Sequence, residues 1–103
     1  MNIYKHETSQ TTVGGTISST TLNIRGGLIR QVLVRANTNT TIFRVDITEV
    51  GGITILNYGY HNGEITDTGK DCALPLPVLG AYQINIVNAS PEDTFNVRIL
   101  IQE

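Results

Sequence analysis

Apolar and polar residues alternate strictly in three segments of the chain, and each of these segments is predicted to be a half-buried β-strand. In residues 41–49, Phe43, Val45 and Ile47 share one face while polar residues occupy the other. The same alternation recurs in residues 81–89 and 94–102. The apolar faces of these strands predict a core that contains Phe43, Val45, Ile47, Ile84, Ile86, Val97 and Ile99.

Less regular segments predict further strands. Residues 16–24 are rich in Thr and residues 28–36 in Val and Leu, and both are expected to be extended. The pair Gly51-Gly52 accepts positive φ without steric cost, so residues 41–49 and 53–58 are predicted to form a hairpin.

Composition agrees with an all-β fold. The chain has 13 Ile, 8 Val and 14 Thr but only 4 Ala, and these β-branched residues favour strands over helices. Turn residues recur about every ten positions, which is typical of sandwiches and barrels. The segment LPLPV, residues 74–78, contains two prolines that cannot donate ladder bonds, so it is expected to be a connection or an edge strand. We therefore predict one small antiparallel β-sandwich or jelly roll of six to eight strands.

The N-terminus differs from the rest of the chain. Residues 5–21 are rich in Ser, Thr, Gly and Gln, with Val13 and Ile17 as the only aliphatic residues. The sequence therefore predicts a polar N-terminal arm over residues 1–15 and a β-sandwich domain over residues 16–103. The arm is either a free tail or an extended segment that becomes ordered by pairing with the edge of a partner's sheet.

Charge and apolar segments limit the expected partners. Seven Lys and Arg against nine Asp and Glu give a net charge of -2, and both signs are scattered, so nucleic acid is not expected as a partner. No apolar run has the roughly 18 residues that span a bilayer, and the start of the chain lacks the apolar segment of a secretory signal. We expect a protein made in the cytoplasm of its host, with no membrane partner.

Residues with catalytic or metal-binding chemistry are few. His6 and His61 are 55 positions apart, and neither has a second ligand at metal-site spacing. Cys72 has only His61 as a possible base, and both are interpreted as loop residues. Residues 67–71 resemble a calcium loop faintly, but the ligands that would complete it are missing, so they are interpreted as a turn. We expect no enzyme activity, no cofactor and no metal.

Two tyrosines raise an alternative function. Tyr58 and Tyr60 are two positions apart in a predicted strand and would share one face, beside His61 and Asn62. Aromatic rings on one face can stack on sugar rings, although hairpin packing is the plainer interpretation. A carbohydrate- or receptor-binding module of a tail fibre or baseplate is therefore the alternative function.

The segment LPLPVLGAYQINIVNASPEDTFNVRILIQE, residues 74–103, together with the glycine-bounded hairpin before it, resembles the closing half of small virion proteins of tailed bacteriophages. The resemblance extends along the chain in its Thr-, Asn- and Ile-rich strands, few charges and polar N-terminal arm. It implies a structural protein of the virion, in particular a capsid decoration or cement protein. The expected partners are the major capsid protein or another virion protein and further copies of the same chain, often as a trimer.

Some strands carry apolar residues on both faces, which predicts a surface that another subunit covers. In residues 28–36, Ile29 and Leu33 would project from the side opposite the natural core face, and Leu56 would do the same in residues 53–58. We predict a homotrimer with Leu33 near its interface and Arg30 or Arg35 at the polar rim. The predicted interface residues are Ile29, Leu33, Arg30, Arg35 and Leu56.

Overall fold

The computed structural model describes residues 3–12, 17–68, 74–88 and 93–102, and these residues form an antiparallel all-β structure without helix. This confirms the predicted fold class. The described strands are β1 (Ile3–Thr11), β2 (Ile17–Ala36), β3 (Ile42–Glu49), β4 (Thr54–Asn62), β5 (Glu64–Asp67), β6 (Leu76–Asn88) and β7 (Thr94–Gln102).

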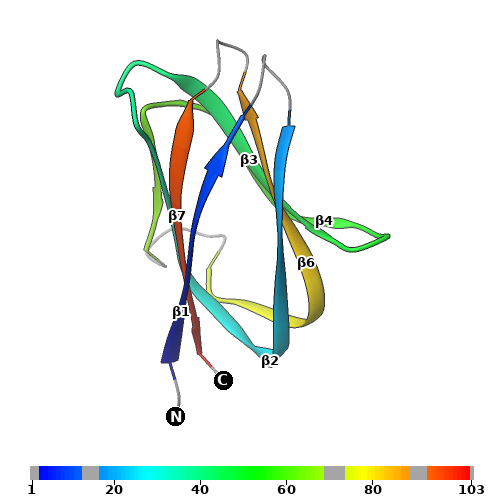
Figure 1. Ribbon diagram of the computed structural model, residues 1–103. Coiled ribbons are helices and arrows are strands. Elements are labelled where there is room, and N and C mark those ends of the chain that lie inside the picture. The colour runs from blue at the N-terminus through cyan, green and yellow to red at the C-terminus, as the bar shows by residue number, and fades with distance from the viewer. Residues whose placement is uncertain (1–2, 13–16, 69–73, 89–92, 103) are drawn as a thin grey trace.

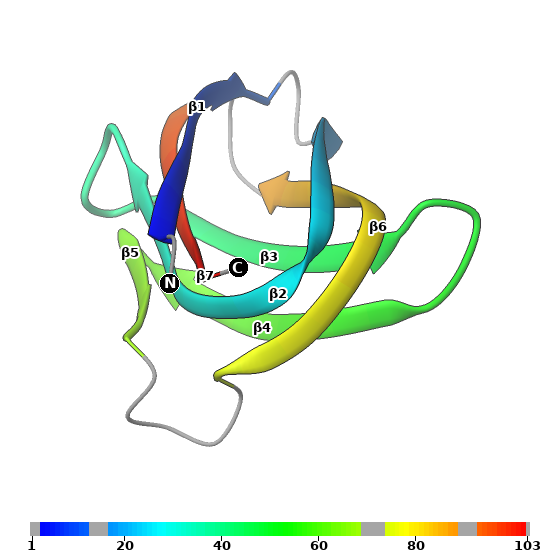
Figure 2. The ribbon, with the colours of Figure 1, turned by 90° about the horizontal axis from the view of Figure 1, so that it is seen from below.

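One continuous sheet folds over to form the two layers of a small sandwich (Figures 1 and 2). The strand order is β1-β7-β2-β6-β3-β4, and β5 pairs with β2. The long strand β2 takes part in both layers, because residues 17–29 pair with β6 and residues 28–36 pair with β7. The two predicted strands 16–24 and 28–36 are thus one strand that bends in the middle.

The bend in β2 depends on two glycines. Gly26 and Gly27 have φ values of 131° and 155°, a region that residues with a Cβ rarely adopt. The pairing of β2 with β6 also shifts register between Ile24 and Gly27. Gly26 and Gly27 therefore let β2 leave the layer of β6, β3 and β4 and enter the layer of β1, β7 and β5.

The core lies between the two layers. Phe43 of β3 and Phe95 of β7 come from opposite layers, and their ring centroids are 4.8 Å apart. All the residues predicted for the core are buried, with at most 2% of their surface exposed, which confirms that prediction. The core residues predicted from the sequence and found buried are Phe43, Val45, Ile47, Ile84, Ile86, Val97 and Ile99.

Two segments with irregular sequence patterns are incorporated into the sheet. Residues 3–11 of the predicted arm form β1, which pairs with β7 at nine successive positions. The part of LPLPV from Leu76 to Val78 begins β6 and pairs with β2, whereas β3 pairs with β6 only from Tyr82 onwards. Pro77 therefore lies where β6 has one strand neighbour among the described residues, as expected of a proline in a sheet.

Candidate functional site

A groove of about 770 Å³ lies on the outer face of the layer formed by β1, β7, β2 and β5. The register of the sheet places its residues in rows that run across the strands. Glu7, Arg98, Leu33 and Thr66 are neighbours in one row, each opposite the next. The adjacent row contains Ser9, Asn96, Arg35 and Glu64.

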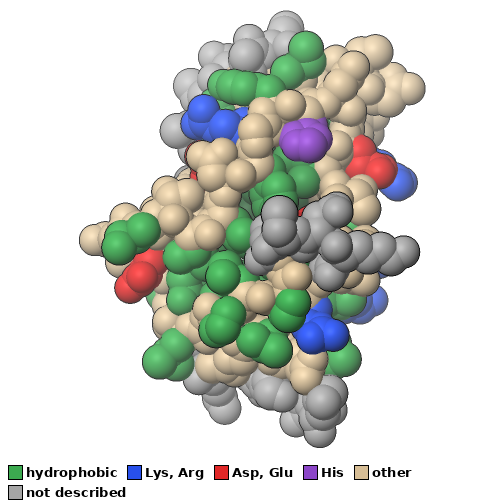
Figure 3. All heavy atoms as spheres, turned by 180° about the vertical axis from the view of Figure 1, so that it is seen from behind, with side chains coloured by type: hydrophobic (Ala, Val, Ile, Leu, Met, Phe, Trp, Pro, Cys, Tyr) green, Lys and Arg blue, Asp and Glu red, His purple; other side chains and the backbone are tan. Residues whose placement is uncertain are grey.

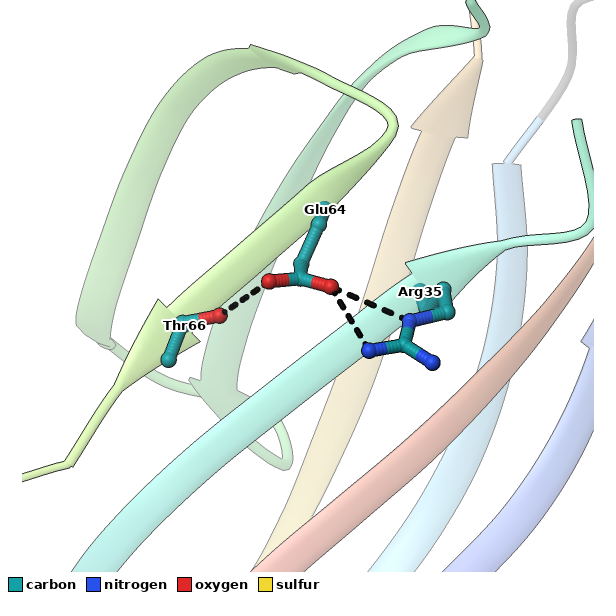
Figure 4. A network of polar contacts seen from close by, with 3 residues as sticks. All are labelled: Arg35, Glu64 and Thr66. Atoms are coloured by element: carbon teal, nitrogen blue, oxygen red, sulfur yellow. Dashed lines mark hydrogen bonds and ion pairs between the residues drawn. The ribbon is translucent and has the colours of Figure 1, made fainter. Parts of the chain in front are cut away.

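Arg35 and Glu64 form an ion pair at the β5 side of the groove (Figure 4). Arg35 Nη2 lies 2.9 Å from Glu64 Oε2, and Arg35 Nε donates a hydrogen bond of 3.0 Å to the same oxygen. The hydroxyl of Thr66 donates to Glu64 Oε1 over 2.9 Å. The hydrogen bonds from Thr66 and from Arg35, together with the positive charge of Arg35, lower the pKa of Glu64. The network keeps Glu64 ionised and fixes the orientation of Arg35.

The other arginine of the groove has a different environment. Arg98 is exposed, and in the described part of the chain no carboxylate lies within 4.0 Å of its guanidinium. Its neighbour Glu7 pairs instead with Lys5, with 3.1 Å between Nζ and Oε1. Leu33 lies between Arg98 and Thr66 and is only half-buried. The groove thus presents an aliphatic side chain beside an arginine that remains available to a partner.

The predicted interface residues divide into three groups. Leu33 and Arg35 line the groove, and Arg30 is exposed but does not contribute to it. Ile29 and Leu56 are core residues, with 0% and 6% of their surface exposed, so the prediction that they lie on an accessible face is wrong.

Bulges explain the two incorrect assignments. The register of β2 against β7 shifts between Ile29 and Gln31, so Ile29 lies on the same face as Val32 instead of the opposite one. Leu56 is paired with Ile47 in the core, and a second register shift follows before Thr48 pairs with Thr54.

A bulge also separates the two tyrosines of the alternative function. Tyr58 is opposite Val45, contacts the core and donates a hydrogen bond to Asp67. Tyr60 is 53% exposed, and the Arg44 guanidinium lies 5.5 Å from its ring centroid on the outside of the sheet. The register shift between Phe43 and Val45 places an extra residue in β4 here. Tyr58 and Tyr60 therefore do not form the two-ring platform that the sequence suggested.

Hydrophobic side chains also gather on the face of the molecule that is seen from behind in Figure 3. The large hydrophobic residues with the highest exposed fractions among those described are Ile53, at 74%, and Leu79, at 71%. The turn after β3 lies beside β6, since Val50 N donates to the Ala81 carbonyl.

Groups with catalytic or metal-binding chemistry are dispersed in the structure. No cluster of three or more His, Cys, Asp or Glu side chains suitable for a metal occurs among the described residues. His61 is exposed in β4, His6 is half-buried in β1, and Cys72 lies outside the described residues. Of the segment 67–71, only Asp67 and Thr68 are described. The Asp67 carboxylate accepts a hydrogen bond from the Tyr58 hydroxyl.

Comparisons with known proteins add no family assignment. No model of a known protein family matches the sequence, and no curated protein is significantly similar to it. Within the described ranges, no helix has the length and apolar character that crossing a bilayer requires.

Proposed function

We propose that this chain is a non-catalytic structural protein of a virion, a capsid decoration or cement protein that binds the head lattice and stabilises it. The groove on the β1-β7-β2-β5 layer carries the proposal, because half-buried Leu33 lines it together with the charged residues Arg98, Arg35, Glu64 and Glu7. Protein interfaces combine an apolar centre with a polar rim and are enriched in arginine. The resemblance of residues 74–103 to small virion proteins of tailed bacteriophages supports this class of function.

The proposed partners are the major capsid protein or another virion protein, together with further copies of this chain. We propose that the copies form a homotrimer, since most oligomers of identical chains are closed and symmetric and the family that the sequence resembles favours threefold clusters. In this proposal the protein is made in the host cytoplasm and ends in the virion. Leu33 and Arg35 contact the partner, and Arg30 lies outside the contact.

The class of function is tested by mass spectrometry of virions purified from the host in which the gene is expressed. The expected result is this chain at a copy number comparable with that of the capsid protein. Virions that lack the chain would contradict the proposal. A glycan bound by the purified protein and lost on Tyr60→Ala would favour the carbohydrate-binding alternative instead.

The contribution of the groove is tested by co-sedimentation with heads from which the protein has been removed. Leu33→Asp places a carboxylate where the groove has an aliphatic side chain and is expected to abolish co-sedimentation. Ile53→Asp is the matched control, because Ile53 is 74% exposed and lies outside the groove. Equal binding by the two variants would assign the contact to another surface.

A further inference from the structure

Among the β1 residues whose side chains the structure describes, none belongs to the buried apolar core, although the strand completes one side of the sheet (Figure 1). It is the terminal strand of the order and pairs with β7. Its inward-facing positions include His6, Thr8 and Gln10, which are polar. The buried hydrophobic residues identified in the described structure all come from outside β1. The described side chains of β1 therefore hold the strand to the sheet by backbone pairing and polar contacts.

The contacts of β1 are nevertheless specific to its sequence. Gln10 Nε2 donates a buried hydrogen bond of 3.3 Å to the Ile84 carbonyl. The next inward residue, Thr12, is fully buried, and its hydroxyl accepts from Asn88 Nδ2 and from Asp93 N, both over 3.3 Å. A strand with apolar residues at these positions would leave buried polar groups with fewer hydrogen bonds, which is costly. The position beside β7 is therefore suited to this sequence, whether from the same chain or from a second copy.

The chain topology does not fix β1 to its own copy. β1 and β2 are consecutive, but β7 separates them in the strand order and they are not paired with each other. The partner strand, β7, lies at the opposite end of the sequence, and Ile3 is paired with Gln102. In a hairpin the hydrogen bonds of β1 would be with β2, the next strand along the chain. Here they are with β7. Exchange of an identical element between copies preserves every contact and is a low-cost route to an oligomer.

We propose that β1 is exchanged between copies of this protein, so that β1 of one chain pairs with β7 of a second chain. This assembly also changes the composition of the groove. Glu7, Thr8 and Ser9 of β1 line the groove together with residues of β7, β2 and β5. Each groove in the exchanged oligomer is thus built from two chains. The inference concerns self-assembly and does not depend on the virion role.

The test uses cysteines on the outer face of the β1–β7 ladder, in full-length chains that carry Cys72→Ser. Ser9 and Asn96 are both exposed and lie opposite each other. Opposite residues of an antiparallel ladder have Cα atoms about 4.5 to 5.5 Å apart, within the range of a disulfide. A chain with Ser9→Cys and a chain with Asn96→Cys are unfolded together, refolded as a mixture and oxidised. Joint refolding lets the strands reach equilibrium, and a non-reducing gel measures the covalent product.

Exchange predicts a disulfide between the two chains, at a yield about tenfold above random collision because β1 holds the cysteines at high effective concentration. The collision control pairs Ser9→Cys with Asn57→Cys, an exposed position on β4 away from β1. The double variant Ser9→Cys/Asn96→Cys confirms that the geometry permits the bond. Glu7→Cys with Arg98→Cys repeats the test at another opposite pair of the same face. A mixture that gives no more product than the collision control, while the double variant closes within single chains, overturns the proposal.

Discussion

The hydroxyl of Tyr58 donates a hydrogen bond of 2.9 Å to the carboxylate of Asp67, and this bond connects the end of β5 to the middle of β4. Between the two strands the chain turns at Gly63, which has a φ of 80°. A Cβ at this glycine would lie 2.5 Å from the Asn39 carbonyl oxygen, so the turn requires glycine. The Tyr58–Asp67 bond and the pairing of β5 with β2 together hold β5 in place, and with it Glu64 and Thr66 in the groove.

Replacing Tyr58 by Phe is expected to lower the free energy of unfolding by about 1 to 3 kcal/mol, because the bond is to a carboxylate in a buried position. Urea denaturation measures the change. Tyr60→Phe is the control, since that ring is exposed and its substitution should change stability by less than about 0.5 kcal/mol. Equal effects of the two substitutions would mean that the Tyr58 hydroxyl contributes no stability.

The same bond predicts a loss of stability at alkaline pH. Burial raises the pKa of Tyr58 far above its usual value of 10.0, and the hydrogen bond and the charge of Asp67 raise it further. Above about pH 10 the unfolded chain loses the tyrosine proton while the folded chain keeps it, so the free energy of unfolding falls with rising pH. Tyr58→Phe should remove this contribution to the fall in the free energy of unfolding with rising pH. Denaturation at several alkaline pH values measures the effect.

Asp93 connects the loop after β2 to the start of β7. Its Oδ2 accepts hydrogen bonds from Thr41 Oγ1, at 2.6 Å, and from Thr38 N, at 3.1 Å, while Oδ1 accepts from Thr94 N at 2.8 Å. Burial disfavours the charged form, but the hydrogen bonds from Thr41, Thr94 and Thr38 outweigh it and lower the pKa of Asp93 below 3.8. Stability from this group is therefore present above the unfolded pKa and is lost as the pH falls through the folded pKa.

We expect Asp93→Asn to reduce the free energy of unfolding at neutral pH by about 1 kcal/mol or more, because an amide nitrogen cannot accept the hydrogen bonds that the carboxylate accepts. The difference between wild type and variant should become smaller as the pH is lowered below about 4, since wild-type Asp93 is then protonated too. Thermal melts across this pH range measure both effects. Glu7→Gln serves as a control at an exposed carboxylate. A difference that is constant with pH would contradict the assigned role of the charge.

Regular strands were predictable from the sequence, and bulged strands were not. Around Ile86 and Val97 the pairing has no register shift, so apolar residues at every second position face the core as the sequence predicts. At Ile29 the shift before Gln31 reverses the alternation, and local sequence does not specify such a shift because it depends on pairing with the distant strand β7. The groove, too, could be predicted from the sequence only in part. Leu33 and Arg35 share a face by simple alternation, whereas the register of three strands brings Arg98 and Glu64 beside them.

Core packing gives a direct test of the sandwich. Ile86 is fully buried, so Ile86→Ala removes methyl and methylene groups from the core and leaves a cavity. The expected loss in free energy of unfolding is about 2 to 5 kcal/mol. Ile53→Ala makes the same chemical change at an exposed position and should cost less than about 0.5 kcal/mol. Similar losses at the two positions would contradict the placement of Ile86 between the layers.

The partly buried position of His6 predicts that acid weakens the pairing of β1 with β7. Its side chain faces inward opposite Ile99, and Nε2 is buried without a hydrogen-bond partner in the described structure. Burial lowers the pKa of His6 below the usual 6.5, because the charged imidazolium loses hydration. Below about pH 6.5 the unfolded chain therefore binds a proton that the folded chain does not, so the free energy of unfolding falls as the pH falls through this range.

The expected result is a lower melting temperature at about pH 5.5 than at about pH 7.5, and a smaller difference in His6→Gln, which cannot be protonated. His61→Gln is the matched control, because His61 is exposed in β4. Hydrogen exchange locates the effect: in the wild type at the lower pH, after correction for the intrinsic rate, amides of β1 and β7 should lose protection before those of β3 and β4. If His6→Gln keeps the full wild-type pH dependence, the acid sensitivity arises from other groups and the attachment of β1 does not depend on the neutral form of His6.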